Sequence, residues 1–527
     1  MAEGDREDEN VKLIEDSTGI RQQTSARPKT KKINESVFSA GATKQAEKSP
    51  GGGRAYNACF LVYLVSISTM GGFIYGYDTS VIGGAQLYFE DDWPGITSSQ
   101  TGMIVSITMI GAAIGALFSG GVSDRFGRKS IIILADVFFT VGSITAALAP
   151  TIWCLELGRF ILGLGVGCHT QIIVYISEIA PVEVRGKLVA FDVLVTTFAQ
   201  MLSAAVCFAL RPHWRWMVGA SAILSVAQLI GMMFMPESPR WLGKMGRTEQ
   251  MHAVMRKVYK PDHLDRALAS LQGEIDALKE ACKLSQCERL KTLFTSYGRC
   301  LLIGVSISVL PELCGIDTAM YYGPLMMKDA GVTIPGLTDG ESSLILNIPL
   351  AAANFLGSVI GVLYIEKLGR RGVLLVTTPL MAVCWIVAAI GMAFTGHGFS
   401  STAQNAGGIT AIVGIMLFIF TFAIGMGPIP DALNAEIYPI HVIATANSLA
   451  SCFNWVADFF ISDLFEIITE VSLAAQVSMY VALGVFCALT FVFTWCFVPE
   501  TAGKPIDQIL TEILGKGYQE QEKAKLR

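Results

Sequence analysis

The stretch SDRFGRK (123–129) decides the fold, because a second version of it, IEKLGRR (365–371), occurs in the second half of the chain. Each copy directly follows the second long apolar run of its half. Another pair of motifs repeats in the same way: SEIAPVEVRG (177–186) follows the fourth apolar run, and AEIYPIHVIA (435–444) follows the tenth. A chance repeat of apolar runs would not place similar polar motifs in matching loops. The chain is therefore predicted to consist of two related halves.

The composition is that of a membrane protein. Of the 527 residues, 52% are hydrophobic and 16% are charged, whereas soluble chains carry about 25% charged residues. Twelve apolar runs, six on each side of a charged middle segment, are each long enough to cross a bilayer as a helix. They cover residues 57–80, 98–122, 130–150, 152–176, 188–210 and 214–235 in the first half, and 300–326, 342–365, 372–395, 408–432, 442–462 and 473–498 in the second.

These runs divide the chain into five parts. We expect a disordered cytosolic tail (1–55), a six-helix bundle (56–235), a cytosolic helical linker (236–299), a second six-helix bundle (300–498) and a cytosolic tail (499–527). The predicted fold is an all-α membrane protein with twelve transmembrane helices in two pseudo-symmetric bundles. Repeats of this kind are typical of transporters, with a binding site near the middle of the membrane between the halves.

Lysine and arginine are concentrated on one side of the predicted membrane, which the positive-inside rule assigns to the cytosol. The loops at 124–129, 182–187 and 366–371 fall there, whereas Arg211 and Arg215 are exceptions. Both ends of the chain are therefore predicted to face the cytosol. The plasma membrane is the expected location, and an internal organelle membrane is the alternative.

Several classes of function have no support in the sequence. The net charge is −5 and the positive residues lie in short loops, which does not indicate nucleic-acid binding. The 12 cysteines are scattered without metal-ligand spacing, so neither a metal nor another cofactor is expected. No combination of nucleophile and base residues that would indicate an enzyme stands out in the sequence. The run GLGVG (163–167) lies within a predicted membrane helix, where its glycines allow close helix packing rather than phosphate binding.

A carboxylate lies at membrane depth in the first apolar segment, GGFIYGYDTSVIGGA (71–85). A charge there costs about 2.5–3.5 kcal/mol on insertion scales, so Asp78 is expected to have a function. Arg159, in the fourth run, is one of few cations at depth in the first half, and Glu156 precedes it on nearly the same helix face. A nearby guanidinium favours the ionised carboxylate, and burial without it favours the protonated form. Joining or parting Asp78 and Arg159 would therefore release or bind a proton.

The motifs together resemble the sugar porter family of the major facilitator superfamily over nearly all of residues 56–510. The resemblance rests on GYDTSVIGGA (76–85), GGVSDRFGRK (120–129), GRFILGLGVG (158–167), PESPRW (236–241), EKLGRR (366–371) and PETAGK (499–504). It implies the major facilitator fold, in which two bundles rock around a central site. In proton-coupled members an Asp and an Arg at the positions of Asp78 and Arg159 pair. This implies that Asp78 is the proton site and Arg159 its switch, with Glu156 as a competitor or relay; the alternative is a static buried ion pair.

The loop motifs predict a salt-bridge latch that holds the two halves together in one state and breaks in the other. Its predicted members in the first copy are Asp124, Arg125, Arg128, Glu178 and Arg185. In the second copy Arg370 and Glu436 remain. The Arg-Gly pair that usually follows the Pro of this motif is replaced by Ile443 and Ala444, so the third member is missing. The alternative is that these charges only set the topology.

The resemblance also places the substrate pocket, and there this chain departs from the hexose pattern. Positions that hold polar or aromatic ligands in hexose porters read Val193, Pro311, Glu312, Asp317, Asn354, Asp431, Asn454 and Trp455. The strings TAMYYGP (318–324), MGPIP (426–430) and NAEIYP (434–439) instead resemble the inositol branch of the family. Gln200 is predicted to reach the cavity from the fifth helix. For Gln200, Asn354 and Asn454 the alternative role is to hydrogen-bond helices together.

Four acidic residues lie within the predicted spans of the second half: Glu312, Asp317, Asp431 and Asp458. Their spans contain no Lys or Arg at similar depth, so these carboxyl groups are expected to be protonated or to accept hydrogen bonds from substrate hydroxyls. A carboxylate that accepts two adjacent hydroxyls of a cyclitol would suit Asp317 and Asp431. Attraction of a cationic substrate is the other interpretation.

The predicted function is proton-coupled symport of myo-inositol or a related polyol by alternating access, by a chain that works as a monomer. The alternatives are a facilitative or proton-coupled hexose transporter, a carrier of a cationic substrate, and a transporter-derived nutrient sensor. The expected partners are the small substrate, protons and the lipid bilayer.

Overall fold

The computed structural model describes residues 55–281, 286–439 and 441–515. The predicted N-terminal tail, apart from residue 55, and the last residues of the predicted C-terminal tail lie outside these ranges. Within them every regular element is a helix, and eleven helical segments are long and apolar enough to cross a membrane. They are Ala58–Asp92 (α1 Ala58–Ser68, α2 Met70–Ala85, η2 Gln86–Tyr88 and α3 Phe89–Asp92), α4 Ser98–Phe126, α5 Arg128–Ala147, α6 Ile152–Ile179, α7 Arg185–Leu210, α8 Trp214–Met233, Gly298–Tyr321 (α13 Gly298–Leu313 and α14 Ile316–Tyr321), α16 Asp339–Leu368 (apolar part Asp339–Ile365), α17 Arg370–Ala393, Ser401–Glu436 (α18 Ser401–Ile424 and α19 Ile429–Glu436) and α21 Leu473–Phe497.

One further long helix, α20 (Ile443–Val471), completes the predicted set of twelve. It has 29 residues, but polar side chains such as Asn454, Asp458 and Glu466 make it less apolar than the other spans. It packs along α4 and α13, and both Asp458 and Glu466 are buried. A polar helix is tolerated at this place because its neighbours cover the polar face and shield it from lipid.

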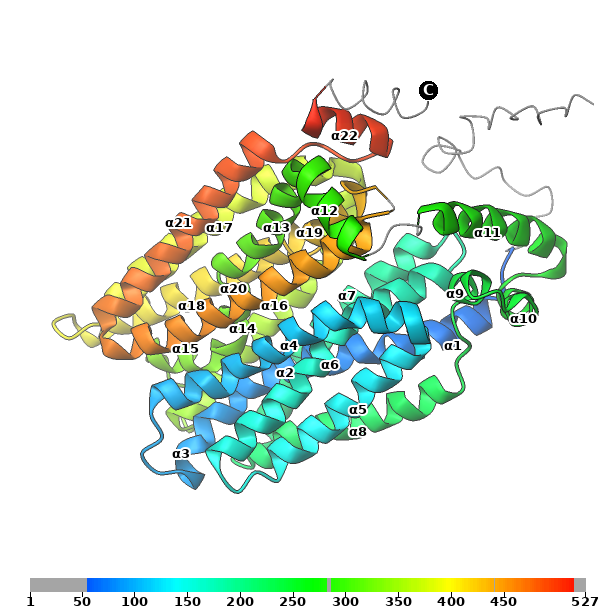
Figure 1. Ribbon diagram of the computed structural model, residues 1–527. Helices are drawn as coiled ribbons and strands as arrows, with labels where there is room; N and C mark the ends of the chain where they lie inside the picture. Colours follow the sequence, from blue (N-terminus) through cyan, green and yellow to red (C-terminus); the bar gives the residue numbers. More distant parts are fainter. Residues whose placement is uncertain (1–54, 282–285, 440, 516–527) are drawn as a thin grey trace, which may run out of the picture. The chain divides into compact units, whose positions relative to one another are not determined.

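The long helices form two groups (Figure 1). In the first group, α1 to α8, the closest packing joins α6 to α4 and α5, α2 to α7, and α5 to α8. In the second group, α13 to α21, it joins α17 to α18 and α21, and α13 to α20. The groups meet where α4 lies along α20, α7 along α16 and α2 beside α14. The residues at this boundary are the ones that a central site would use.

Glycines set the close approach of α4 and α6. A β-carbon on Gly111 would lie 3.0 Å from the Cα of Gly163, and one on Gly115 would lie 3.1 Å from the Cα of Gly167. Real β-carbons rarely come so near, so only glycine lets the two backbones touch here. The structure thus confirms the helix-packing interpretation of GLGVG (163–167).

A break in one predicted span positions two acidic residues. The run predicted at 300–326 divides at Gly315, whose φ of +86° is a left-handed conformation that favours glycine. Just before it, Pro311 removes a backbone donor from α13. The break leaves Glu312 near the end of α13 and Asp317 in the first turn of α14, so that both carboxyl groups face the same region.

The middle segment is helical, as expected from its sequence pattern. It contains α9 (Pro239–Lys244), α10 (Thr248–Val258), α11 (Pro261–Ala281) and α12 (Gln286–Ser296), with apolar side chains buried between the first three. Figure 1 shows these helices at one end of the long helices, together with α22 (Ile506–Leu514). The loops 123–129 and 365–371 lie at this end, called the motif end below.

Candidate functional site

Asp78 of α2 and Arg159 of α6 form a buried ion pair. Arg159 Nη1 lies 2.7 Å from Asp78 Oδ2, and the two side chains are 1% and 4% exposed. Arg159 Nε also donates a hydrogen bond of 3.3 Å to the carbonyl of Ile104 in α4. The other oxygen of Asp78, Oδ1, is buried and has no hydrogen-bond partner in the described part of the chain. The carboxylate therefore retains an unused acceptor beside its guanidinium.

The glycines around Asp78 explain how α2 reaches this position. A β-carbon on Gly76 would lie 3.1 Å from Thr196 Cα and still closer to the Thr196 carbonyl, so α2 packs directly on the backbone of α7. Next to Asp78, Tyr77 donates a 2.8 Å hydrogen bond to the carbonyl of Met217. These contacts hold the turn of α2 that carries the carboxylate against α7 and α8.

Glu156 does not join the pair in this conformation. It is partly buried, and no hydrogen bond or ion pair joins it to Arg159 or to Asp78 in the described ranges. No contact in this conformation therefore supports the predicted role of Glu156 as a competitor or relay. The reason is that the guanidinium of Arg159 points towards α2 and α4.

Three of the four acidic residues of the second group come together. Glu312, Asp317 and Asp458 offer carboxylate oxygens that all lie within 4.8 Å of one another. Asp458 accepts a 2.9 Å hydrogen bond from Ser462 and a 3.4 Å one from the Tyr321 hydroxyl, whereas Glu312 Oε2 is buried and has no partner among the described residues. Asp431 lies elsewhere, with an exposed side chain on α19.

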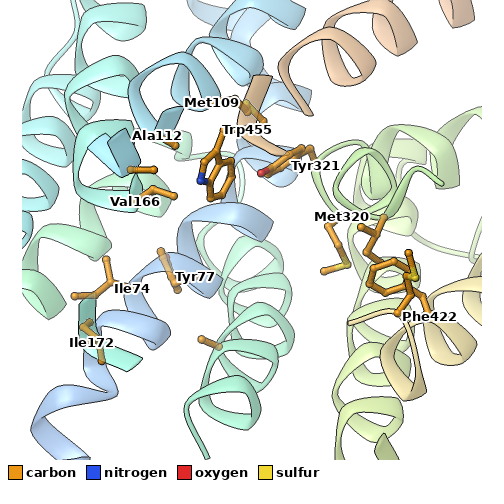
Figure 2. Packing of buried hydrophobic residues seen from close by; sticks show 14 of the residues in the cluster. Ile74, Tyr77, Met109, Ala112, Val166, Ile172, Met320, Tyr321, Phe422 and Trp455 are labelled. Atoms are coloured by element: carbon orange, nitrogen blue, oxygen red, sulfur yellow. The ribbon is translucent and has the colours of Figure 1, made fainter. Parts of the chain in front are cut away.

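Aromatic side chains lie between this acidic cluster and the first group. The ring of Tyr75 in α2 meets Trp455 of α20 edge to face at 6.1 Å. Figure 2 shows Trp455 between Ala112 and Val166 of the first group and Tyr321 of the second. Tyr75 was not singled out from the sequence, although it lies in the motif that contains Asp78.

Polar contacts join the two groups in the middle of the helices and on the side away from the motif end. Asn354 Nδ2 of α16 donates a 2.7 Å hydrogen bond to Gln200 Oε1 of α7, so these two predicted pocket residues meet. Arg211 pairs with Glu341 at 2.7 Å, and Gln86 donates a 3.2 Å hydrogen bond to the Tyr321 carbonyl. Arg211 is one of the two exceptions to the predicted one-sided distribution of Lys and Arg, and this ion pair provides it with an acidic partner. The other exception, Arg215, pairs with Asp92 at 3.0 Å.

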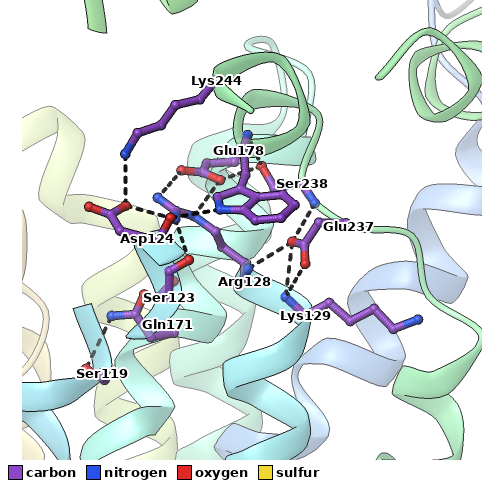
Figure 3. A network of polar contacts seen from close by, with 11 residues as sticks. Ser119, Ser123, Asp124, Arg128, Lys129, Gln171, Glu178, Glu237, Ser238 and Lys244 are labelled. Atoms are coloured by element: carbon purple, nitrogen blue, oxygen red, sulfur yellow. Dashed lines mark hydrogen bonds and ion pairs between the residues drawn. The ribbon is translucent and has the colours of Figure 1, made fainter. Parts of the chain in front are cut away.

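At the motif end, Arg128 is the centre of a network (Figure 3). Its guanidinium donates to Glu178 and to Asp124, each at 3.0 Å. Glu237, just before α9, accepts hydrogen bonds from the backbone N–H groups of Arg128 and Lys129. Burial raises the pKa of the Glu237 carboxyl, and these backbone donors act in the opposite direction. The network ties α4, α5 and α6 to the linker.

The second half repeats part of this network. Arg370 pairs with Glu436 at 2.9 Å, and Glu500 accepts the backbone N–H groups of Arg370 and Arg371 as Glu237 does in the first half. Glu237 and Glu500 were not predicted as site residues. The Pro-Glu pairs in PESPRW (236–241) and PETAGK (499–504) repeat between the halves, and comparing them would have identified both carboxylates.

The structure corrects three details of the predicted latch. The pairs of Arg128 and of Arg370 each lie within one helix group or join it to the linker, so they do not hold the two halves together here. Arg185 does not pair with Glu178, and its Nε is buried without a partner in the described ranges. Arg125 makes no ion pair with the described residues, and its guanidinium lies 5.3 Å from the ring of Phe126.

Two groups of long helices with buried polar residues at the boundary between them are typical of transporters of the major facilitator type. The chain matches the family model described as "Sugar (and other) transporter" over residues 64–512, and it belongs to this family. It is therefore a transporter and not an enzyme.

Two named proteins and one solved structure illustrate what this chain is similar to. The chain is 32% identical to the "Putative metabolite transport protein YwtG" of Bacillus subtilis, over 87% of this chain and 96% of that protein. It is 28% identical to the human "Proton myo-inositol cotransporter", over 85% and 81% of the two chains. An inward-open structure of the xylose transporter XylE from E. coli matches with a TM-score of 0.71 and 26% identity, over 86% of this chain and all of that one.

Proposed function

We propose that this chain is a proton-coupled symporter of myo-inositol or a related polyol. The observation that carries the proposal is the buried pair of Asp78 and Arg159, whose carboxylate keeps one oxygen free of any partner in the described part of the chain. The similarity to the human proton myo-inositol cotransporter supports the same substrate class.

In the proposed cycle, Asp78 takes up a proton when Arg159 moves away from it. Neutralising the carboxylate removes its attraction for the guanidinium, which shifts the balance between the two conformations. Gln200, Asn354, Asn454 and the acidic residues then bind hydroxyl groups of the substrate, while Trp455 packs against the ring. Binding the substrate and the proton together favours the change of state more than either does alone.

The conformation described here corresponds to one of the two states of this cycle. Arg211 with Glu341 and Gln86 with the Tyr321 carbonyl join the two groups away from the motif end. The charged networks described at the motif end stay within one group and the linker. These contacts support a state closed on the side away from the motif end, which we assign to the outside of the membrane. With both chain ends on the cytosolic side, this is an inward-facing state.

A second candidate function is transport of a cationic substrate. Glu312, Asp317 and Asp458 bring three carboxyl groups within 4.8 Å, with no Lys or Arg within ion-pair distance of them among the described residues. A protonated amine would satisfy such a cluster electrostatically. The polyol remains the primary proposal because neutral hydrogen-bonding residues and Trp455 line the same boundary.

We further propose that the chain acts as a monomer in the plasma membrane, with an internal organelle membrane as the alternative.

The deciding experiment is uptake by the full-length protein in proteoliposomes. Labelled myo-inositol, glucose and a polyamine are each tested with and without an imposed pH gradient. We expect myo-inositol to be concentrated only when the gradient is present. Accumulation of the polyamine alone would replace the polyol with the cationic substrate, and glucose uptake that ignores the gradient would indicate a facilitative hexose carrier.

A further inference from the structure

A cavity of about 480 Å³ lies where the linker meets the start of the first membrane helix. Its walls come from the first residues of α1, the end of α10 and the start of α11, which lie together at the motif end (Figure 1). The volume is within the range of small-ligand sites, about 300–1,000 Å³. The lining includes Arg256, Lys260, Tyr56 and Tyr259, and no acidic residue of the described chain lines it. None of these residues takes part in the sites discussed above.

Two backbone hydrogen bonds hold the walls of the cavity together. The N–H of Asn57 donates to the carbonyl of Val258 at 2.8 Å, and the N–H of Lys260 donates to the carbonyl of Ala55 at 3.0 Å. The residues between them form a short antiparallel bridge. The basic end of α10 is therefore fixed beside the start of α1.

The basic side chains at the cavity have no acidic partner. Arg256 and Lys260 are exposed and make no ion pair or side-chain hydrogen bond with the described residues. Glu249 lines a smaller neighbouring cavity of about 270 Å³ that shares Arg256, but it does not pair with the guanidinium. The start of α1 adds a partial positive charge at the same wall. The cavity is therefore positively charged, which suits an anionic group.

The surface of α1 just beyond the cavity faces lipid. Val62 lies one helical turn after Ala58, a residue of the cavity wall, on the same face of the helix. The side chain of Val62 is 65% exposed and that of Tyr63 is 47% exposed, as expected for apolar residues that contact lipid. The cavity thus lies at the level of the lipid headgroups on the motif end. This end is the proposed cytosolic side, where the anionic lipids of a membrane are concentrated.

We propose that the cavity between α1 and α10 binds the phosphate-bearing headgroup of an anionic phospholipid: Arg256 and Lys260 contact the phosphate, and the lipid chains lie along Val62. Guanidinium and ammonium groups donate strong, charge-assisted hydrogen bonds to phosphate oxygens. A headgroup bound in this way joins the linker to the first membrane helix. The inference goes beyond the proposed transport function and does not depend on the transported substrate.

Native mass spectrometry of the full-length protein in detergent tests the proposal, because it resolves bound lipids one at a time. Phosphatidic acid, whose headgroup is a phosphate monoester, is compared with phosphatidylcholine, whose headgroup has no net charge. We expect the first phosphatidic acid to bind at least about tenfold more tightly than the first phosphatidylcholine. Arg256→Gln and Lys260→Gln are each expected to weaken this binding about fivefold, the usual effect of one basic residue near anionic lipid. Equal affinities of the two lipids for the wild type would overturn the inference.

Two further variants separate a site in the cavity from general attraction to the linker. The double variant Lys257→Gln with Arg266→Gln is the matched control for Arg256→Gln with Lys260→Gln, because it removes the same charge from exposed linker residues outside the cavity. We expect the control to bind phosphatidic acid as the wild type does, and an equal loss in both double variants would overturn the site. Ala58→Trp keeps every charge but fills part of the cavity, so it is expected to weaken binding. Wild-type affinity in Ala58→Trp would show that the headgroup does not lie in the cavity.

Inorganic phosphate distinguishes a lipid from a soluble anion as the ligand. It is not expected to displace phosphatidic acid at equal concentration, because it lacks the chains that pack on α1. Displacement would replace the lipid by a free phosphate and overturn the proposal.

Melting temperatures in nanodiscs give an independent measurement. Adding phosphatidic acid to phosphatidylcholine nanodiscs is expected to raise the melting temperature of the wild type but not that of Arg256→Gln with Lys260→Gln, because a ligand stabilises only the protein that binds it. Arg256 also lies in the last turn of α10, where a basic residue favours the end of a helix. A melting temperature that the double variant lowers equally in both lipids would assign Arg256 to this structural role alone and contradict the inference.

Discussion

The side-chain amide of Asn354 donates a 2.7 Å hydrogen bond to the side-chain oxygen of Gln200, joining α16 of one helix group to α7 of the other. Both side chains are buried, at 7% and 6% exposure. Two amides that meet across the internal boundary can serve the substrate, the packing of the helices, or both. Substituting each amide distinguishes a role in substrate binding from a role in helix packing.

Asn354→Ala is expected to weaken binding of myo-inositol about five- to tenfold, because a neutral hydrogen bond contributes on the order of 1 kcal/mol. Gln200→Ala should have a similar effect, and the double variant should lose less than the sum if the two side chains bind one substrate group together. Equilibrium binding to the purified variants is the measurement. If the melting temperature falls while the affinity is unchanged, the two amides only hold the helices together.

Asp78→Asn is expected to abolish accumulation of substrate driven by a pH gradient while sparing exchange across the membrane. An amide neither binds nor releases a proton, so substrate movement is no longer tied to proton movement. Accumulation and counterflow in proteoliposomes give the two readouts. A variant that still concentrates substrate when only protons drive it would show that Asp78 is not the coupling residue. Glu156→Gln is a useful comparison, because Glu156 does not contact the pair in this conformation.

The combined variant Asp317→Asn with Asp431→Trp is expected to weaken myo-inositol transport and to admit hexose. These changes restore the residue types that hexose porters are expected to have at the two positions. Because Asp317 lies in the acidic cluster and Asp431 lies apart from it, the single variants should act independently. Competition by glucose against labelled myo-inositol measures the change. An unchanged affinity for myo-inositol in the double variant would remove both residues from the site.

Arg128→Ala is expected to slow turnover more than it weakens substrate binding. Arg128 joins Asp124, Glu178 and the linker at the motif end, far from the acidic cluster, so its loss changes the relative stability of conformations. Arg125→Ala is the matched control, since Arg125 makes no ion pair with the described residues. Rates of counterflow and equilibrium binding are compared for both variants. Weakened binding with a normal cycling rate would refute the role of Arg128 in the change of state.

Gly127→Ala is expected to destabilise the protein by about 1–3 kcal/mol, the usual range for a strained backbone position. Gly127 has a φ of +102°, and a β-carbon there would lie 2.7 Å from the carboxyl carbon of Glu237. Gly186→Ala is the control, because Gly186 lies in helix α7 with no atom near its absent side chain. Melting temperatures in detergent measure the effect. Equal stability of the two variants would show that the Glu237 contact is dispensable.

Much of the architecture could be predicted from the sequence alone. Apolar runs of sufficient length specify membrane helices wherever they occur, because an unpaired backbone in lipid is too costly. The repeated loops at 123–129 and 365–371 identified two halves. The pairing of Asp78 with Arg159 was implied by the resemblance to the sugar porter family, and two opposite charges at membrane depth agree with it. These features depend on local composition and on chain order, which a sequence displays directly.

Other features were decided only by the tertiary structure. Contacts between helices depend on how each helix is rotated and where its neighbours lie, and a single sequence does not state either. For this reason the chain order could not show that Glu312, Asp317 and Asp458 meet within 4.8 Å while Asp431 lies apart. It also did not show that Arg128 pairs within its own half, or that Asn354 meets Gln200 across the boundary. The sequence determined which residues lie in the membrane, and packing determined which of them touch.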